Sequence, residues 1–298
     1  MPLLIDAFDP PFEVVGAAGQ DLPAVFNSPH SGRTYPESFL RRSRLDALTL
    51  RRSEDCHVDE LFTGVVDLGC PLLRANFPRA YLDLNREPYE LDPAMFGDRL
   101  PEFANTSSMR VAGGLGTIPR IVSEHEEIYD QPLSFEEAEA RIERLYRPYH
   151  RTLTQLVAST SETFGGCVLI DCHSMPSTAA PQTASGARAR ADVVLGDRFG
   201  ASAAPAITGA LERAFAAAGM SVVRNKPYAG GFITQTHGRP REGLHSIQVE
   251  INRALYLDEP LLRPNANFAR LKAAIGAAAA HFLRDLPDLI APRRIAAE

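Results

Sequence analysis

The chain has 298 residues and a net charge of -6, with 45% apolar and 23% charged residues. This balance is typical of globular proteins that bury a sizeable core, and it lacks the basic excess expected of nucleic-acid-binding proteins. No apolar run is long enough for a membrane span, and residues 1–12 carry acids and prolines where a signal peptide would carry basic residues. Four cysteines without a CxxC pair favour free thiols, so we expect a cytoplasmic protein; the sequence indicates no oligomeric state.

Short apolar runs alternate with helical patterns along the chain, which is typical of an α/β fold. Several of these runs are apolar on both faces, as expected for central strands that are covered on both sides. We find no repeat or linker and therefore expect one domain over residues 1–298, with a mixed central sheet and helices on both faces. The predicted strands are Ala24–Asn27, Cys70–Asn76, Ala80–Asn85, Cys167–Asp171, Asp192–Gly196, Ser221–Arg224 and His245–Ile251.

The helical patterns carry recognisable start and stop signals. A capping box of Ser134 and Glu137 opens a long helical pattern, in which Pro148 should cause a kink or a break. An alanine-rich pattern predicts a helix over 204–218 that ends at a glycine, and a last helix covers about 265–286. The segment 87–119 has no periodicity, and we predict a long loop of a length that usually has a function.

Two predicted strands are followed closely by a histidine, His30 and His173. Ligands bind at the carboxyl ends of strands in open α/β sheets, so two imidazoles far apart in sequence can meet at one cation. Either histidine alone is more commonly a structural or surface residue. Catalytic zinc takes three ligands of the His, Asp or Glu type and leaves one position for water. The segment 51–59 offers several such side chains, although a charged helix start is its simpler interpretation.

The strand predicted over 245–251 carries a candidate base. Alternation places Ile247 and Val249 on one face and Gln248 and Glu250 on the other. A carboxylate at the strand end can accept a proton from an attacking water, which typically contributes roughly 10² to 10⁴ in rate. A glutamate on the polar face of an edge strand is the simpler alternative.

The strand predicted over 80–85 has a polar side. Alternation groups Tyr81 with Asp83 and Asn85, and arginines at positions 79 and 86 bracket the strand. Guanidinium groups near a metal suit a substrate that bears a carboxylate, and they can also stabilise an oxyanion. An amphipathic strand with surface arginines is the simpler interpretation.

These segments together resemble the N-formylglutamate amidohydrolase family. The matching motifs occur in the family's order and extend over about residues 27–256. They are Ser28-Pro29-His30-Ser31-Gly32, Glu54-Asp55-Cys56-His57, Arg79-Ala80-Tyr81-Leu82-Asp83-Leu84-Asn85-Arg86, Asp171-Cys172-His173-Ser174-Met175-Pro176, Gly230-Gly231-Phe232-Ile233-Thr234 and Val249-Glu250-Ile251. The family is in turn similar to zinc carboxypeptidases and aspartoacylases. The resemblance therefore implies a zinc-carboxypeptidase-like (phosphorylase/hydrolase-like) fold with one zinc ion per chain at the strand ends.

The resemblance also implies the ligand set. His30 and His173 correspond to zinc ligands, and Glu250 corresponds to the base that shuttles the proton. The carboxypeptidase pattern has a glutamate ligand three residues after the first histidine, where this chain has Arg33. We therefore expect the carboxylate ligand to be Asp55, since the family usually keeps an aspartate there.

The remaining implied roles concern the surroundings of the zinc. Glu54 is the reserve carboxylate ligand, and His57 would orient a ligand or a water. The resemblance assigns binding of the substrate carboxylate to Asn85 and Arg86, and a second, catalytic anion contact to Arg79. Gly231 and Thr234 are expected in the pocket wall, where glycine permits a close backbone approach.

The reaction implied by the resemblance is hydrolysis of N-formyl-L-glutamate to formate and L-glutamate, a step of histidine degradation. The residues by themselves support only cleavage of an amide or similar acyl bond near a carboxylate. Another N-acyl amino acid or a γ-glutamyl amide is therefore an alternative substrate. A non-catalytic ligand-binding relative would lack a ligand or the base. A thiol amidase using Cys172 or Cys56 is disfavoured, because Cys172 and the adjacent His173 point to opposite faces of a strand.

Overall fold

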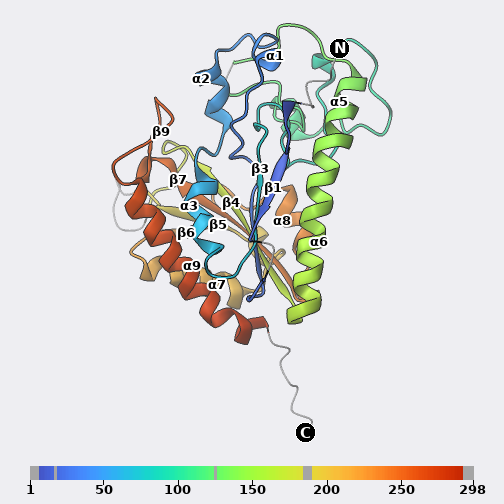
Figure 1. Ribbon diagram of the computed structural model, residues 1–298. Coiled ribbons are helices and arrows are strands. Elements are labelled where there is room, and N and C mark those ends of the chain that lie inside the picture. Colours follow the sequence, from blue (N-terminus) through green and yellow to red (C-terminus); the bar gives the residue numbers. More distant parts are fainter. Residues whose placement is uncertain (1–6, 17–18, 124–125, 184–189, 291–298) are drawn as a thin grey trace.

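The structure, a computed structural model, describes residues 7–16, 19–123, 126–183 and 190–290, so part of the amino-terminal segment 1–12 lies outside it. A seven-stranded sheet runs through the centre of the molecule (Figure 1). In spatial order its strands are β1 (Phe12–Val15), β3 (Leu72–Ala75), β2 (Ala24–Ser28), β4 (Cys167–Met175), β7 (Leu244–Asn252), β5 (Val193–Gly196) and β6 (Val222–Arg224). A separate two-stranded ribbon pairs β8 (Leu257–Asp258) with β9 (Arg263–Pro264).

The sheet is mixed. Strands β3, β2, β4 and β7 are parallel to one another, whereas β1 pairs antiparallel with β3 and β5 pairs antiparallel with β7. Every residue of β2, β4 and β7 is buried, because helices cover both faces of these central strands. Their carboxyl ends lie at the same edge of the sheet, where parallel strands bring the residues that follow them together.

Helices lie on both faces of the sheet (Figure 1). One face is covered by α3 (Val58–Phe62), α7 (Pro205–Ala217) and α9 (Phe268–Ile290), and the other by α6 (Arg147–Phe164) and α8 (Phe232–His237). Consecutive residues of β4 alternate between the two cores, with Leu169 in one and Ile170 in the other. The predicted mixed α/β fold is thereby confirmed, in agreement with the zinc-carboxypeptidase-like fold that the resemblance implies.

The remaining helical elements are short and connect the larger ones. The helices are α1 (Glu37–Leu40), α2 (Ala47–Leu50), α4 (Met109–Ala112) and α5 (Phe135–Arg141), and 3₁₀ turns cover Arg51–Ser53, Thr63–Val65, Pro93–Met95, Arg198–Gly200, Pro240–Glu242 and Arg253–Leu255. The predicted loop 87–119 is confirmed, with α4 and one 3₁₀ turn as its regular structure.

The predicted helices are confirmed with adjusted ends. Ser134 caps α5 by accepting a hydrogen bond from the Glu137 N–H at 3.2 Å. The helix does not stop at Pro148: a π-helical segment, Ile142–Tyr146, joins α5 to α6, and Pro148 lies in the first turn of α6. Because these segments are continuous, the donor that Pro148 lacks falls beside the junction, where the helix changes from π to α geometry instead of ending. The predicted helix over 204–218 is α7, and the last helix, α9, begins and ends slightly later than predicted.

The strand predicted over 80–85 is wrong. This segment forms turns, in which the N–H groups of Tyr81 and Leu82 donate to the carbonyl of Pro78 instead of to a neighbouring strand. The Asp83 N–H donates to the Thr117 carbonyl at 2.8 Å, and the Asp83 carboxylate accepts from the Asn85 N–H at 2.8 Å. Tyr81 therefore lies in the same core as Leu82, and Asp83 and Asn85 are free to enter the functional site.

Candidate metal centre and active-site cavity

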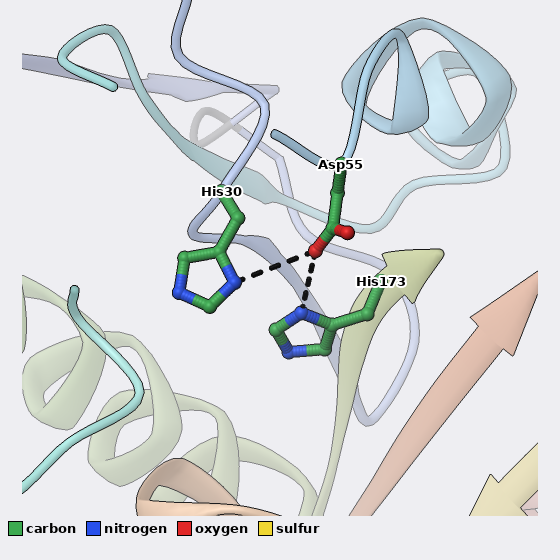
Figure 2. A group of neighbouring side chains, drawn as sticks. All are labelled: His30, Asp55 and His173. Atoms are coloured by element: carbon green, nitrogen blue, oxygen red, sulfur yellow. Dashed lines mark hydrogen bonds and ion pairs between the residues drawn. The ribbon is translucent and has the colours of Figure 1, made fainter. Parts of the chain in front are cut away.

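Two imidazoles and one carboxylate converge at the carboxyl ends of β2 and β4 (Figure 2). His30 follows β2, His173 lies near the end of β4, and Asp55 lies in the turn before α3. One Asp55 oxygen, Oδ2, is 3.4 Å from His30 Nδ1 and 2.9 Å from His173 Nδ1. The three candidate ligand atoms lie within 4.8 Å of one another, and all three residues are buried.

The backbone after β2 holds this arrangement. The Asp55 N–H donates to the His30 carbonyl at 3.0 Å, so the two ligand-bearing segments are joined directly. The Ser31 hydroxyl donates to the Asp55 carbonyl at 3.0 Å and accepts from the Asp59 N–H at 3.1 Å. A Cβ at Gly32 would lie 2.0 Å from the Phe77 carbonyl oxygen, so glycine is required for this close approach.

The outer nitrogens of both imidazoles are bound by carboxylates. His30 Nε2 lies 2.8 Å from Asp83 Oδ1, and His173 Nε2 lies 2.9 Å from Asp171 Oδ2. A carboxylate on the outer nitrogen fixes the orientation of a metal-ligating histidine and raises its basicity. The inner atom His30 Nδ1 is buried and has no hydrogen-bond partner among the described residues. This donor set, with two inner nitrogens facing one carboxylate oxygen, fits a divalent cation such as zinc.

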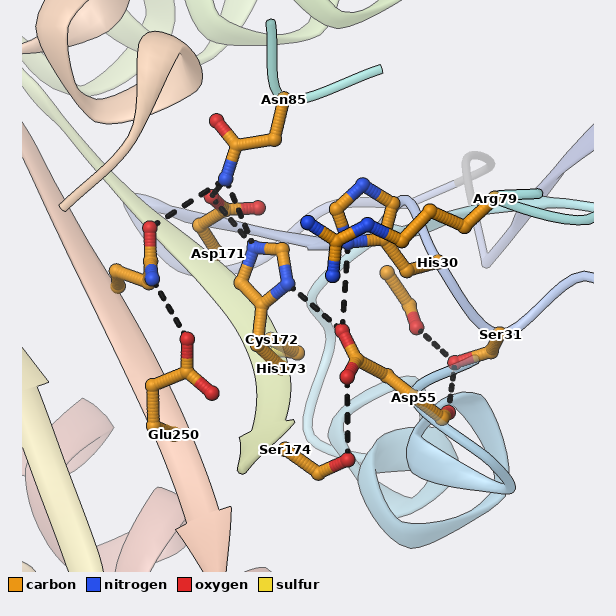
Figure 3. A network of polar contacts seen from close by, with 12 residues as sticks. His30, Ser31, Asp55, Arg79, Asn85, Asp171, Cys172, His173, Ser174 and Glu250 are labelled. Carbon is orange, nitrogen blue, oxygen red and sulfur yellow. Dashed lines mark hydrogen bonds and ion pairs between the residues drawn. The ribbon is translucent and has the colours of Figure 1, made fainter. Parts of the chain in front are cut away.

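The second oxygen of Asp55 is held by protein donors (Figure 3). The Ser174 hydroxyl and Nη2 of Arg253 each donate to Asp55 Oδ1 at 3.2 Å. Burial raises the pKa of Asp55, but the hydrogen bond with His173 and the nearby His30 imidazole outweigh burial and hold that pKa well below its usual range. Asp55 is therefore a carboxylate whose Oδ2 is directed toward the two imidazoles.

Two residues predicted near the metal lie elsewhere. The Glu54 carboxylate, the reserve ligand, pairs with Arg51 at 3.1 Å and accepts a hydrogen bond from the Cys56 thiol at 3.3 Å. The His57 imidazole lies 2.9 Å from Glu60, and neither Glu54 nor His57 belongs to the described cavity lining. The prediction that His57 orients a ligand is corrected: His57 has a left-handed backbone (φ 60°) at the start of α3, and its ring contacts that helix's own Glu60.

Glu250 faces the metal-site group from β7 (Figure 3). It is the register partner of His173 on β4, and the predicted alternation holds, since Ile247 and Val249 point into the core on the opposite side. The Gln248 amide donates to Glu250 Oε1 at 2.7 Å. Burial, more than any other cause, raises the pKa of Glu250 to about 7. A carboxylate with this pKa can both accept and return a proton near neutral pH.

A cavity of about 440 Å³ opens onto these groups. His30, Asp55, His173 and Glu250 line it together with residues from the 79–86 turn, the 110–122 loop and the 227–231 segment. Among the predicted substrate-binding residues, Arg79, Asn85, Arg86 and Gly231 belong to the lining. Arg79 donates from Nε to Asp83 at 2.9 Å. Burial lowers the pKa of Arg79, but the negative charges of Asp83, Asp55 and Glu250 outweigh burial and raise that pKa, so the guanidinium stays charged.

The fifth predicted contact, Thr234, lies behind the cavity wall. Its hydroxyl donates to the Gly231 carbonyl at 2.9 Å, and in the described part of the chain Thr234 does not line the cavity. The two glycines before α8 are close to other groups: a Cβ at Gly230 would lie 2.5 Å from the Thr234 hydroxyl oxygen, and one at Gly231 would lie 2.4 Å from the Asn85 side chain. The predicted close approach at this pair is therefore present, with Thr234 in a supporting position.

The cysteine alternative lacks support in the geometry. Cys172 points into the core on the face of the sheet opposite His173, and Cys56 packs in the same core. Burial raises the pKa of the Cys56 thiol to about 12 and that of the Cys172 thiol well above its usual range. Neither thiol is poised to form the thiolate that nucleophilic attack requires.

Sequence reasoning missed several residues that complete the site. Asp171 could have been found, because it lies two positions before His173 on one strand and therefore shares its face. Asp83 and Gln248 were seen only as members of polar faces. Arg253 had no signal in the sequence, because its bonds reach the Glu54 carbonyl and the Asp55 carboxylate across the fold.

A mixed α/β fold with a candidate metal centre in a cavity at its strand ends indicates an enzyme that acts on a small molecule. Comparison with known proteins specifies the family. The family model for N-formylglutamate amidohydrolase matches residues 22–257, so the chain belongs to the N-formylglutamate amidohydrolase family of enzymes.

Individual relatives agree with this assignment. The chain is 30% identical to an N-formylglutamate deformylase of Pseudomonas putida, over 80% of this chain and 83% of that protein. It is 28% identical to an N-formylglutamate deformylase of Pseudomonas aeruginosa, over 83% of this chain and 86% of that protein. A crystal structure of N-formylglutamate amidohydrolase from Ralstonia eutropha superposes with a TM-score of 0.84 at 37% identity, covering 92% of this chain and 98% of that one.

Proposed function

We propose that this protein is a zinc-dependent amidohydrolase that cleaves N-formyl-L-glutamate to formate and L-glutamate. The observation that carries the proposal is the convergence of His30 Nδ1, His173 Nδ1 and Asp55 Oδ2 at the floor of a cavity. The shared fold and family of proteins named N-formylglutamate deformylase support the choice of substrate. The whole chain acts as one catalytic domain, which is supported by the single large sheet with a core on each face.

In this proposal His30, Asp55 and His173 hold one zinc ion. A zinc ion with three protein ligands supplies a Lewis acid that lowers the pKa of water towards neutrality and polarises a carbonyl group. Asp83 and Asp171 orient the two imidazoles through their outer nitrogens.

Glu250 serves as the general base and acid. It accepts a proton as the water oxygen bonds to the formyl carbon, and it returns that proton to the nitrogen as the carbon–nitrogen bond breaks. Its burial and its pKa of about 7 support both halves of this role. Arg79 stabilises the oxyanion, since its terminal nitrogens form no hydrogen bond with the described residues and it lines the cavity.

Asn85 and Arg86 bind the α-carboxylate of the substrate. Arg86 is held by the carbonyls of Leu115 and Asn85 at 2.7 and 2.8 Å, and a fixed guanidinium loses little freedom on binding. Asn85 is likewise held, since its Oδ1 accepts from the Ile233 N–H at 2.9 Å. The backbone of Gly231 closes this side of the cavity.

The test is metal analysis of the purified protein combined with turnover of a substrate panel. The panel contains N-formyl-L-glutamate, N-formyl-L-glutamine, N-acetyl-L-glutamate and γ-glutamyl amides. We expect about one zinc per chain, loss of turnover on chelation, recovery with zinc, and the highest kcat/KM for N-formyl-L-glutamate. A higher kcat/KM for another panel member would replace the proposed substrate.

Two other outcomes would replace the class of function. Turnover that survives chelation but is lost to a thiol reagent would indicate a thiol amidase. Saturable binding of the panel without turnover would indicate a ligand-binding protein. For the cellular setting, the structure has no helix among its described residues that could cross a membrane. The cytoplasmic location and the place in histidine degradation stay predictions.

A further inference from the structure

The cavity is lined by more arginines than carboxylates. Five arginines line it, Arg52, Arg79, Arg86, Arg110 and Arg253, against three carboxylates, Asp55, Asp83 and Glu250. Even before a metal ion is counted, this lining suits a ligand that carries more than one negative charge. The substrate of the proposed function, with two carboxylates, has that property, so each carboxylate requires its own cationic partner.

Two of these arginines are less available to a ligand deep in the cavity. Arg253 donates to the Ser174 hydroxyl, to the Arg52 and Glu54 carbonyls and to the Asp55 carboxylate, all within 3.2 Å. Arg52 pairs with Glu126 at 2.9 Å, and its side chain is 52% exposed at the rim. Neither guanidinium presents a free fork to a ligand deep in the cavity.

Arg79 and Arg86 have assigned positions near the reacting centre. Arg79 donates to Asp83 at 2.9 Å, and Asp83 bonds to the candidate ligand His30 at 2.8 Å, so the Arg79 guanidinium lies near the candidate metal ligands (Figure 3). Arg86 is the α-carboxylate partner in the proposed function. A second carboxylate, separated from the first by a short methylene chain, must lie farther from the metal site.

Arg110 is the remaining arginine of the described cavity lining. It lies in α4 and lines the cavity, and its guanidinium forms no hydrogen bond with the described residues. Its ion pair with Glu90 Oε2 is loose at 3.7 Å, and the Arg110 side chain is 38% exposed. Arg110 and Arg86 line the same cavity, together with Leu115.

The loop that carries Arg110 is tied to the site by hydrogen bonds. The Ser108 hydroxyl bonds to the Glu90 carboxylate and accepts from the Val111 N–H at 3.1 Å, which fixes the start of α4. The Leu115 N–H donates to the Arg110 carbonyl at 2.8 Å, and the Leu115 carbonyl accepts from Arg86 at 2.7 Å. Leu115 therefore links the backbone of Arg110 to the guanidinium of Arg86, so the two arginines lie on segments that are joined directly.

We infer that Arg110 is a specificity-determining residue that binds the side-chain carboxylate of an N-acyl dicarboxylic amino acid while Arg86 binds the α-carboxylate. The inference rests on the proposed function and adds to it the recognition of the second acid. A carboxylate accepts two parallel hydrogen bonds from a guanidinium, whereas the neutral amide of a glutamine side chain has one acceptor oxygen and an NH2 group that donates. The amide therefore cannot replace the carboxylate at Arg110. The site should therefore discriminate N-formyl-glutamate from N-formyl-glutamine, which have nearly the same shape.

The test compares kcat/KM for these two substrates in the zinc-loaded wild-type protein and in three variants. Arg110→Gln should lower kcat/KM for N-formyl-L-glutamate by about tenfold to a hundredfold, through KM, and should lower the preference for glutamate over glutamine by at least tenfold. Arg99→Gln is the matched control, because Arg99 is exposed and lies outside the described cavity lining. Arg52→Gln tests the rival cation at the rim. Melting temperature and zinc content verify that each variant is folded and loaded.

The outcomes separate the inference from the function on which it rests. If the wild-type protein hydrolyses neither substrate, the proposed function fails. If the wild type hydrolyses both equally well, or if Arg110→Gln keeps the full preference for glutamate, the role of Arg110 is overturned and the proposed function stands. If Arg52→Gln alone removes the preference, the second carboxylate belongs to Arg52 and the inference about Arg110 is likewise overturned.

Discussion

The substitution Glu250→Gln separates the base from the candidate metal ligands. It keeps the size of the side chain and its hydrogen bond to Gln248, but an amide cannot accept the proton of the attacking water. The other carboxylates of the described cavity lining are engaged, Asp55 by two imidazoles and Asp83 by Arg79 at 2.9 Å, so neither can replace the base. General-base catalysis contributes roughly 10² to 10⁴ in rate, and the absence of a substitute favours the upper half of that range.

A fall of about 10³ to 10⁴ in kcat corresponds to roughly 4 to 5.5 kcal/mol in the activation free energy. The assay is formate release from N-formyl-L-glutamate at pH 7, with the zinc content measured on the same samples. We expect zinc content to be unchanged, since Glu250 is outside the His30, Asp55 and His173 group. Glu60→Gln is the control, because Glu60 is 39% exposed and pairs with His57. A kcat within tenfold of wild type for Glu250→Gln, or loss of its zinc, would refute the reasoning.

Three further predictions concern residues that surround the site. Asp171→Asn weakens the carboxylate contact to His173 and should lower zinc affinity about tenfold to a hundredfold in a chelator competition. Arg253→Met leaves the buried Asp55 charge without its arginine and should lower the free energy of unfolding in urea by about 3 kcal/mol or more. Burial lowers the pKa of His150 from its ordinary 6.5 to about 4. The unfolded chain therefore takes up a proton at a higher pH than the folded protein, and the free energy of unfolding should fall by up to about 3 kcal/mol as the pH falls from 6.5 to 4.

Each of these changes has a control and a contradicting result. Asp59→Asn alters a buried carboxylate outside the described cavity lining and should leave zinc affinity unchanged; equal losses in both variants would indicate a general effect of folding. Arg33→Met removes half-exposed ion pairs and should lower the free energy of unfolding by less than about 1 kcal/mol. An equally small loss for Arg253→Met would count against the role of Arg253 as the partner of the buried Asp55. In His150→Leu, the free energy of unfolding of the metal-free protein should depend less on pH between 6.5 and 4. An unchanged pH dependence would contradict the role of His150.

Local sequence pattern predicted the parts of the fold that depend on burial within single strands. The runs that became β2 and β4 are largely apolar because both of their faces are covered. In β7, period-two alternation placed Glu250 on the face opposite Ile247. The half-buried edge strand β1 had no such run and was missed. The convergence of His30 and His173 followed from their positions at the ends of parallel strands.

Other features depend on contacts between distant segments and could not be predicted locally. The 80–85 segment alternates like a strand, but the Thr117 carbonyl and the turn at Pro78 take its backbone donors. The choice between Glu54 and Asp55 depends on Arg51, which binds the Glu54 side chain, and on the distant Arg253. Arg110 lies in an aperiodic loop, where sequence pattern carries no information about direction.

The central claim is that His30, His173 and Asp55 share one metal ion. The most direct measurement is an anomalous difference map, recorded at the zinc absorption edge, from crystals of the zinc-loaded protein. We expect one peak per chain, at about 2.0 to 2.2 Å from His30 Nδ1, His173 Nδ1 and an oxygen of Asp55. A zinc peak bound by other residues, or fully loaded crystals without a peak between these three side chains, would contradict it.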